Sequence, residues 1–531
     1  MKKILELSLL PHEAENNKII EERVSHQKHL GKITGFRVNK KSIDARRNPI
    51  KVILHVEVFI DEEISSLRFN PYQFKEAVQN KGVVIIGAGP AGLFTALRLL
   101  EEGIKPIIIE RGKNVKDRRR DVANINKQQL INPNSNYCFG EGGAGTYSDG
   151  KLYTRSNKRG DMKKVLELFV QHGADPSILI EAHPHIGTNK LPQIIEQIRN
   201  TILENGGEIH FSTLLTDIEL RNDEIKYIKT KNTETSEEKN FNTENLVLAT
   251  GHSARDIYIL LQQKKVVLEA KSFAIGVRVE HPQSLIDKIQ YHCHDLRAVE
   301  KIREHLPAAA YSLVQQVEGR GVYSFCMCPG GIIAPCATEQ NQIVVNGWSP
   351  SKRNNPYANS GMVVSIEPED YKGFKNHGPL AGMYLQQHLE QTCWLAGGKT
   401  QVAPAQRLQD FVNGKSSSSL PDCSYQPGIK SFELNDLFPS SISKRLREGF
   451  KHFGKKMNGY LSSDAIVVAI ESRTSSPVRI PRNPNTFEHV TVKGLYPIAE
   501  GAGYAGGIMS AAMDGQQCAS KIIKKNSSSI K

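Results

Sequence analysis

Three glycines and a glutamate between residues 83 and 110 have the types and spacing needed to hold a pyrophosphate. Gly87, Gly89 and Gly92 follow a short apolar run in a GxGxxG pattern, and Glu110 ends the next apolar run. Glycine permits a sharp turn, a close approach of backbone to phosphate, and tight packing of a helix on a strand. The start of the helix offers unpaired N–H groups to phosphates, and an acid after the second strand can accept hydrogen bonds from ribose hydroxyls.

This pattern predicts a site for the ADP half of a dinucleotide. The alternative interpretation is a glycine-rich turn in an ordinary strand–helix–strand unit, but the terminal acid favours the nucleotide. The contact residues predicted here are Gly87, Gly89, Pro90, Ala91, Gly92, Glu110 and Arg111.

The GxGxxG spacing occurs twice more, in other contexts. Gly140, Gly142 and Gly145 lie in CFGEGGAGTYSDGKLY, which has no strand and terminal acid behind it. This segment is typical of a flexible loop packed against a flat ligand, where a Cβ would clash. We therefore expect Gly142, Gly143 and Gly145 to contact the ligand. The third spacing begins at Gly501 and precedes a helix near the C-terminus.

Cysteines are candidates for redox chemistry. Cys326 and Cys328 stand two apart in a predicted strand, which would place both side chains on one face. They could be redox thiols, or metal ligands together with Cys336, or small buried side chains. A disulfide between two cysteines at this spacing would be strained.

Histidines and arginines supply further candidates. His185 and His183 flank a proline before a predicted helix and could donate a proton near neutral pH, as could His281. Arg473 could bind an anionic substrate or balance cofactor charge, and the alternative is a structural ion pair with Glu471. Weaker candidates of the same kind are Arg278 and Arg353.

Composition limits the class of protein. The 531 residues include 69 Lys and Arg and 56 Asp and Glu, which gives a net charge of +13. This basic charge raises the possibility of RNA or DNA binding, which we treat as a minor alternative. The scattered cysteines and the lack of a long apolar run favour a cytoplasmic protein without a membrane span. The densest basic cluster spans residues 111–120, and it could serve an anionic cofactor or form a solvated helix face. No GxSxG, HExxH or Walker pattern occurs, which excludes the common hydrolase and NTPase sites.

The elements that must position these residues suggest an α/β fold. An amphipathic helix is predicted over 189–204, followed by short strands at 208–211, 214–220 and 225–229 and by a buried strand ending at Ala249-Thr250-Gly251. This layout resembles the FAD domain of the glutathione-reductase-like flavoproteins, in which the turn at Thr250 and Gly251 would close over the nucleotide.

The chain then returns to this domain near its end. Residues 495–515 predict a strand, an acid, glycines and a helix. In FAD enzymes of this kind a late strand ends in Gly-Asp, whereas here the order is Glu500-Gly501. The resemblance implies that Glu500, Gly501 and Gly506 contact the cofactor, and the helix start would face the flavin.

Four domain segments are predicted from these patterns. A small N-terminal α/β domain of strand–helix–strand (βαβ) type covers 1–75, with a helix over 13–30 and a linker over 65–82. A Rossmann-like FAD-binding domain, made of a parallel sheet and a β-meander, covers 80–265 and 471–531. A mixed α/β substrate domain over 266–470 is inserted into it.

Longer motifs carry a resemblance to one family. They are CFGEGGAGTYSDGKL (138–152), HPHIGTNKL (183–191), SFAIGVRVEHP (272–282), YSFCMCPGG (323–331), NGWSPSKRNNPYANSGMVV (346–364) and ESRTSSPVRIPR (471–482). Together they resemble a bacterial family of FAD-dependent dehydrogenases. The resemblance implies FAD and redox chemistry but supplies no substrate, which we expect to be a small molecule.

The expected function is hydride transfer at flavin N5, with NAD(P)H or a protein as electron donor. The N-terminal domain could dock such a protein. The catalytic candidates are Cys326, Cys328, His185 and Arg473. Two alternatives remain: an FAD-dependent RNA-modifying enzyme, suggested by the charge, and a non-catalytic flavin-binding sensor.

Overall fold

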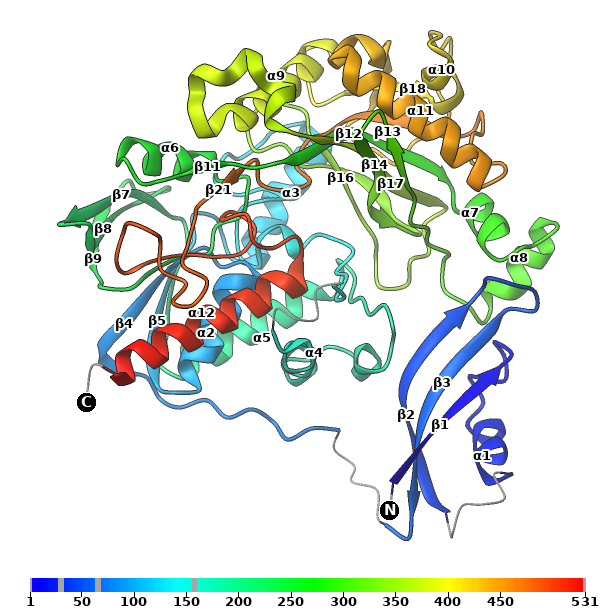
Figure 1. Cartoon of the computed structure of the whole chain (residues 1–531), viewed down its shortest axis with the longest axis horizontal. Helices are drawn as coiled ribbons and strands as arrows, with labels where there is room; N and C mark the ends of the chain where they lie inside the picture. The colour runs from blue at the N-terminus through cyan, green and yellow to red at the C-terminus, as the bar shows by residue number, and fades with distance from the viewer. Residues whose placement is uncertain (1, 27–32, 63–67, 155–159, 529–531) are drawn as a thin grey trace.

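The computed structural model describes residues 2–26, 33–62, 68–154 and 160–528. Figure 1 shows three bodies: a parallel-sheet domain, an antiparallel-sheet domain beside it, and an N-terminal domain that projects from both. The first two domains exchange segments, because the chain crosses from the parallel sheet to the antiparallel sheet and returns for its last strand and helix. In the described ranges, no helix combines the length and the apolar character required to cross a membrane.

A five-stranded parallel sheet forms the centre of the parallel-sheet domain. Its order is β22 (Leu495–Pro497), β10 (Leu246–Leu248), β4 (Val78–Ile86), β5 (Ile104–Ile109) and β6 (Glu208–His210). Helices α2 (Pro90–Leu100), α5 (Leu191–Glu204) and α12 (Ile508–Ser528) lie together on one face (Figure 1). The meander of β7 (Thr213–Arg221), β8 (Glu224–Asn232) and β9 (Glu238–Asn242) packs on the other face.

Alternation along the central strands explains this layering. Val83 and Ile85 of β4 pack with the helices, whereas Val84 and Ile86 pack with the meander. Successive strand side chains point to opposite faces, so a continuous apolar run is buried on both sides. The run that opens the GxGxxG motif is therefore the centre of a three-layer core.

The predicted meander is shifted along the chain. The first predicted strand, at 208–211, is β6 and extends the parallel sheet instead. The third meander strand is β9, which lies in a polar stretch where the sequence predicts no strand. Only Phe241 of β9 is buried, so this strand carries almost no hydrophobic pattern.

A seven-stranded sheet forms the antiparallel-sheet domain. Its order is β13 (Val314–Val317), β14 (Arg320–Cys328), β17 (Tyr357–Ile366), β12 (Phe273–Pro282), β20 (Ile466–Glu471), β18 (Ala403–Arg407) and β19 (Ile429–Ser431). All pairs are antiparallel except β18 with β19. The strand β20 is fully buried, and the sequence did not predict it because its five consecutive apolar residues show no alternating pattern.

Helices α9 (Ala381–Ala396) and α11 (Ser440–Lys456) cover this sheet at the top of Figure 1. The other elements around the two sheets are α3 (Val115–Gln128), α4 (Met162–Gln171), α6 (Arg255–Gln263), β11 (Glu269–Ala270), α7 (Gln283–Gln290), α8 (Leu296–Arg303), β15 (Ile332–Pro335), β16 (Val345–Trp348), α10 (Leu408–Asn413) and β21 (Val478–Arg479).

The N-terminal domain differs from the strand–helix–strand unit that the sequence predicted. It contains β1 (Lys2–Leu9), α1 (Asn17–Ser25), β2 (Ile33–Asp44) and β3 (Lys51–Ile60), in an antiparallel sheet of order β1-β3-β2. The prediction of a βαβ domain is therefore wrong, because it missed β2. That edge strand has no fully buried residue and so lacks a clear alternating pattern. Residues 27–30 of the predicted helix and 65–67 of the predicted linker lie outside the described residues.

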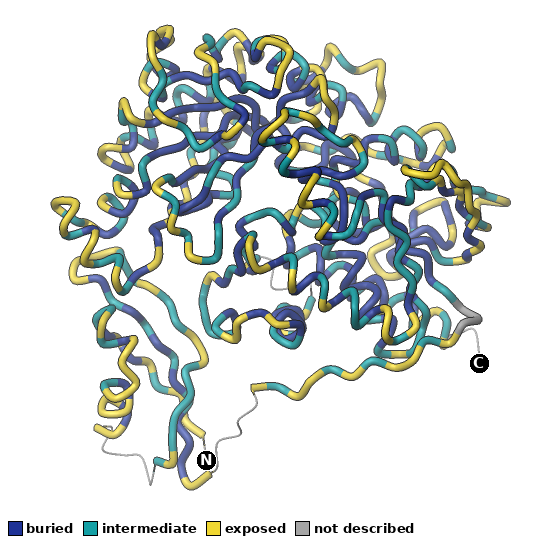
Figure 2. Tube along the Cα trace, turned by 180° about the vertical axis from the view of Figure 1, so that it is seen from behind, coloured by how far each residue is buried: buried dark blue, intermediate teal, exposed yellow. Residues whose placement is uncertain are grey.

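The N-terminal domain contacts the rest of the chain through β2. The Lys41 N–H donates to the carbonyl of Ile180 (2.7 Å), and the Ala182 N–H donates to the carbonyl of Lys41 (2.9 Å). The connecting segment before β4 is mostly exposed, as Figure 2 shows by its yellow and teal tube. The domain thus touches the segment that immediately precedes His185.

Candidate functional site

The first glycine turn has the geometry that a phosphate cradle requires. Gly87 has φ +106°, and a Cβ there would lie 2.8 Å from the carbonyl oxygen of Ala249. A Cβ on Gly92 would lie 2.0 Å from the carbonyl oxygen of Gly87, so only glycine lets α2 pack on β4. In contrast, a Cβ on Gly89 would meet no atom of the described residues closer than the Gly143 Cα, at 3.9 Å. Gly87 and Gly92 thus shape the turn, and Gly89 leaves space in front of the helix N-terminus.

Glu110 lies at the centre of this turn. Its carboxylate is almost fully buried and accepts hydrogen bonds from the backbone N–H groups of Ala88 (2.8 Å), Gly112 (2.9 Å) and Gly140 (3.0 Å). It therefore ties the first glycine turn to the second glycine loop. The predicted contact between Glu110 and a ribose stays a prediction. The guanidinium of Arg111 pairs with Asp256 (3.0 Å) and stacks on Phe139, so its charge is neutralised by protein.

The second glycine loop packs directly on the first turn. The Gly142 N–H donates to the Ala88 carbonyl (2.8 Å), and both Gly142 (φ +76°) and Gly143 (φ +60°) are in the left-handed region. A Cβ on Gly143 would lie 3.2 Å from the Cα of Gly89. The two glycine segments therefore form one cradle.

Arg118 holds this loop in place. Its buried guanidinium donates to the carbonyl oxygens of Asn136 (2.8 Å), Tyr137 (2.9 Å) and Glu141 (2.7 Å). In the sequence, this residue is one of several basic residues in the cluster over 111–120, and nothing there predicts its structural role. Its helical neighbours Arg119 and Arg120 are exposed, and this alternation along α3 is the signal that could have separated Arg118 from them.

The returning strand completes the edge of the cradle. The Gly501 N–H donates to the Thr250 carbonyl (3.0 Å), and a Cβ on Gly501 would lie 2.3 Å from that oxygen. Glu500 lies 3.2 Å from Nδ1 of His252. Cβ atoms on Gly251 and Gly506 would meet no described residue within 4 Å, so open space extends along this edge toward α12.

A second group of residues lies where the two large domains meet. Lys151, six residues after Gly145, donates a hydrogen bond from Nζ to the carbonyl of Met327. Met327 separates Cys326 from Cys328. The loop that carries the second glycine segment therefore reaches the two cysteines across the domain interface.

The two cysteines lie in a β-bulge and not in a regular strand. The register of β14 against β17 shifts between Phe325 and Cys328, and Cys326 has φ +46°. The expectation that both side chains lie on one face of a regular strand is therefore wrong, because the bulge re-aims one of them. The Cys328 sulfur lies 3.3 Å from the Cys326 carbonyl oxygen, so the two residues still face each other.

A fully buried arginine supports this bulge. Arg278 donates to the Cys326 carbonyl (2.7 Å), to the Cys328 sulfur (3.4 Å) and to the Glu471 carboxylate (2.9 Å). The hydrogen bond from Cys328 to the Cys326 sulfur lowers the pKa of Cys326 well below its usual value, and Lys151 and Arg278 lower it further. The same hydrogen bond and burial raise the pKa of Cys328. The geometry thus favours a thiolate on Cys326 beside a thiol on Cys328.

Two further predicted residues, Arg353 and His185, join this group. Asp149 lies 3.8 Å from Lys151 and accepts a hydrogen bond from Arg353 (3.1 Å). His185 forms a backbone bridge with Lys151, and its ring nitrogen Nε2 lies 3.1 Å from the Ser351 carbonyl. Burial lowers the pKa of His185, so its ring is neutral at pH 7. The sequence analysis missed Lys151 and Asp149, although both lie in the SDGKL end of the glycine segment.

Comparisons with known proteins agree with a flavin cradle. Residues 80–129 match a model described as an FAD binding domain, residues 272–474 match "FAD-dependent protein, C-terminal domain-like", and residues 1–59 match a domain of unknown function. An uncharacterized protein from Clostridium beijerinckii is 40% identical over 96% of both chains. The chain belongs to this family of FAD-dependent proteins.

Solved structures of flavoproteins share only a weak likeness with the chain. A flavin-dependent brominase variant is 13% identical over 83% of this chain and 80% of its own, with a TM-score of 0.37. L-proline dehydrogenase from P. horikoshii is 14% identical over 85% and 94%, with a TM-score of 0.34. At these scores the likeness does not assign an activity.

FAD fits the cradle described above. An elongated dinucleotide needs backbone without side chains along its path, and the positions at Gly89, Gly251 and Gly506 leave that space at the carboxyl edge of the parallel sheet. The N-termini of α2 and α12 both begin there. The protein binds FAD, and the individual contacts of the predicted glycines stay predictions.

Arg473 lies outside the cysteine group, in a structural charge network. Glu390 is fully buried and pairs with both Arg473 (3.0 Å) and Arg255 (2.9 Å). Nη2 of Arg473 also donates to Gln342 (2.8 Å), and Nη1 donates to Thr338 (2.9 Å). The expected ion pair with Glu471 is therefore wrong, because Glu471 pairs with Arg278. Each side-chain nitrogen of Arg473 is hydrogen-bonded to protein, and its predicted catalytic role stays a prediction.

Two other histidine candidates do not join the site. His281 is fully buried against the Tyr460 ring, its Nε2 lies 2.8 Å from the Tyr460 carbonyl, and burial lowers its pKa to about 4. It belongs to the core of the antiparallel-sheet domain. His183 packs edge-on against Tyr153, and burial lowers its pKa as well.

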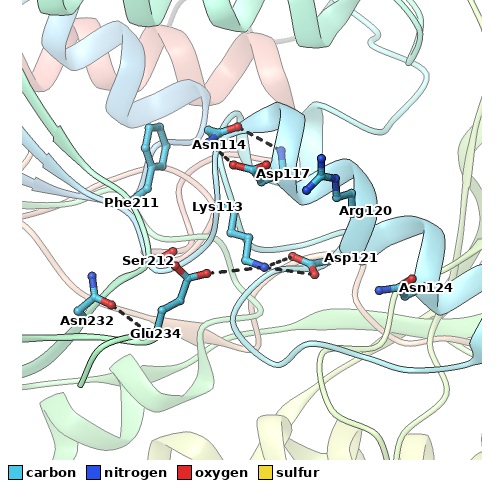
Figure 3. A pocket seen from close by; sticks show the side chains of 10 residues that line it. All are labelled: Lys113, Asn114, Asp117, Arg120, Asp121, Asn124, Phe211, Ser212, Asn232 and Glu234. Atoms are coloured by element: carbon cyan, nitrogen blue, oxygen red, sulfur yellow. Dashed lines mark hydrogen bonds and ion pairs between the residues drawn. The ribbon is translucent and has the colours of Figure 1, made fainter. Parts of the chain in front are cut away.

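The basic cluster after Glu110 borders a polar cavity of about 540 Å³ (Figure 3). Inside it, Nζ of Lys113 pairs with Asp121 (3.3 Å) and Glu234 (3.7 Å). Asp117 also lines the cavity and is hydrogen-bonded to Asn114. Acids therefore balance the charge of Lys113 within the cluster, and the expectation about nucleic acid stays a prediction.

Proposed function

We propose that the protein is an FAD-dependent oxidoreductase whose reacting centre lies at the domain interface beside Lys151, Cys326 and Cys328. The observation that carries this proposal is the hydrogen bond from Lys151 to the Met327 carbonyl. It joins the glycine loop of the FAD cradle to Cys326 and Cys328, and the Cys328 sulfur lies 3.3 Å from the Cys326 carbonyl oxygen. A sensor that held FAD only for structure would have no need of an ionised thiol beside the cradle.

The residues of this centre have separable roles. FAD, when bound, supplies two-electron transfer at N5. Arg278 fixes the shape of the bulge through the Cys326 carbonyl, and it stays charged because Glu471 lies beside it. Lys151 places a positive charge next to Cys326, and Asp149 holds that charge in position. His185 packs against the same loop as a neutral ring and helps to exclude water.

The substrate is a small molecule that enters at the domain interface, and electrons come from NAD(P)H bound transiently or from a protein donor. A transient donor suits this chain, because the sequence holds one GxGxxG motif followed by a helix, a strand and an acid. The N-terminal domain touches the segment before His185 and is the surface we assign to a protein donor.

The test is anaerobic reduction of the bound flavin. Purified holoprotein is mixed under nitrogen with NADH, NADPH or dithionite, and the visible absorbance of the flavin is followed. We expect bleaching with dithionite and with one physiological donor, followed by return of the absorbance when air is admitted. Flavin that stays oxidised with every donor, including dithionite, would contradict the proposal.

A further inference from the structure

We propose that Cys326 and Cys328 are a redox-active dithiol that passes an electron pair between the bound flavin and an external disulfide substrate. This inference rests on the proposed function and names its substrate class. The Cys326–Cys328 disulfide accepts two electrons from the reduced flavin and takes up a proton, which breaks the S–S bond and leaves a thiolate on Cys326 and a thiol on Cys328. The Cys326 thiolate then attacks the external disulfide, and one substrate sulfur leaves as a thiolate. Cys328 attacks the mixed disulfide, which restores the S–S bond and releases the second substrate thiol.

The bulge brings the Cys328 sulfur against the backbone of Cys326. In a regular strand, residues i and i+2 lie on the same face with their Cα atoms roughly 7 Å apart, which is the upper limit for a disulfide. The left-handed conformation of Cys326 (φ +46°) turns the chain back on itself at this point. The Cys328 sulfur consequently lies 3.3 Å from the carbonyl of Cys326. A disulfide closed over so few residues is strained, and strained disulfides are the readily reduced ones.

Exposure and charge give the two thiols different roles. Cys326 is partly exposed, whereas Cys328 is fully buried, so an external sulfur can reach only Cys326. Lys151 and Arg278 both place positive charge beside Cys326, and Cys328 donates a hydrogen bond to its sulfur. A nucleophilic thiolate backed by a protonated, buried thiol is the arrangement that attack and resolution require.

Polar groups without partners support a ligand at this place. Among the described residues, Oε1 of Glu471 and Nδ2 of Asn359 are buried and have no hydrogen-bond partner. Both side chains contact Arg278 through their other atom. Burial raises the pKa of Glu471 to about 7 although Arg278 opposes this, which suits the carboxyl to exchange the proton that Cys328 takes up and releases.

The experiment counts electrons. Holoprotein is oxidised with diamide, freed of reagent, and titrated anaerobically with dithionite while the flavin absorbance is recorded. The wild type should consume about two equivalents per FAD, one for the flavin and one for the disulfide, since each is a two-electron couple. Cys326→Ser and Cys328→Ser should each consume about one, and the control Cys293→Ser, altered at a distant partly exposed cysteine, should match the wild type.

Peptide mapping without reducing agent gives a second readout that does not depend on variants. A Cys326–Cys328 link should appear after diamide treatment and disappear after reduction of the flavin. A wild type that consumes one equivalent and shows no linked peptide would overturn the dithiol, while a flavin that is still bleached would leave the oxidoreductase intact. A flavin that no donor reduces would overturn the oxidoreductase instead, and peptide mapping would then judge the dithiol alone.

Discussion

The Nζ atom of Lys151 donates a hydrogen bond to the carbonyl oxygen of Met327, and this contact joins the two halves of the site. Lys151 belongs to the loop that carries the second glycine segment of the FAD cradle. Met327 belongs to the bulge that presents Cys326 and Cys328. The charge and the thiols are therefore placed by two different domains, so the site exists only when the domains are packed together.

Removing the charge of Lys151 should make Cys326 less acidic. In Lys151→Met, the midpoint pH for alkylation of Cys326 by iodoacetamide should move upward, because a cation that stabilised the thiolate is lost. Peptide mass spectrometry across a pH series measures this midpoint. Lys163→Met on the exposed face of α4 should leave it unchanged. Equal midpoints in both variants would show that Lys151 does not act on the thiol.

Gly89→Val should yield folded but colourless protein. Its backbone is extended (φ −76°), and a Cβ would lie 3.9 Å from the nearest atom of the described residues, so the fold tolerates a side chain that the pyrophosphate does not. FAD content, from absorbance after purification, should fall at least about tenfold, which corresponds to roughly 1.4 kcal/mol of binding free energy. Gly373→Val, in open surface space, should retain FAD. Stoichiometric FAD in Gly89→Val would contradict the cradle.

Arg118→Met should weaken FAD binding by loosening the second glycine loop. Three buried carbonyl oxygens would lose their donor, and each unsatisfied group costs about 1–3 kcal/mol. We expect the dissociation constant of FAD, measured by flavin fluorescence on apoprotein, to rise at least about tenfold. Arg119→Met on the exposed face of α3 is the control. An unchanged constant in Arg118→Met would mean that the loop does not depend on this anchor.

Glu390→Gln should destabilise the fold without changing the chemistry of the thiols. The substitution leaves Arg255 and Arg473 buried without a counter-ion, a loss of about 3–5 kcal/mol in the free energy of unfolding. Burial opposes ionisation of Glu390, but the two arginines lower its pKa to about 2. Its stabilisation is therefore complete above its ordinary pKa of 4.5 and disappears as the pH falls toward 2. Urea unfolding at several pH values measures this, and a variant as stable as the wild type at pH 7 would contradict it.

The sequence predicted the turn at Gly87 and Gly92 correctly, because the backbone geometry of each residue there depends on its neighbours in the chain. Gly87 needs a positive φ, Gly92 needs the absence of a Cβ, and both follow an apolar strand. Helix α5 was also predicted correctly, because its apolar residues recur at regular helical spacing. By contrast, β2 and β9 are largely polar edge strands, and their identity depends on partners that no local pattern reveals.

The charged site residues were harder to predict, because their roles depend on tertiary partners. Arg473 and Arg278 are both buried arginines near one strand, yet one binds Glu390 and the other Glu471. The spacing of two residues between Arg473 and Glu471 made them plausible partners, but β20 ends between them and sends their side chains to different networks. The hydrogen bond between Lys151 and Met327 likewise could not be predicted, because the two residues lie far apart in the sequence and no motif contains both.

The central claim is that the reacting end of the flavin lies beside Cys326, and one measurement tests it directly. In Cys328→Ser, which keeps Cys326 as a thiol in every state, the midpoint pH for alkylation of Cys326 is measured with the flavin oxidised and again after photoreduction. The account predicts a higher midpoint with reduced flavin, because negative charge on the reduced ring opposes a neighbouring thiolate. Identical midpoints in the two states would place the thiol away from the ring and contradict the account.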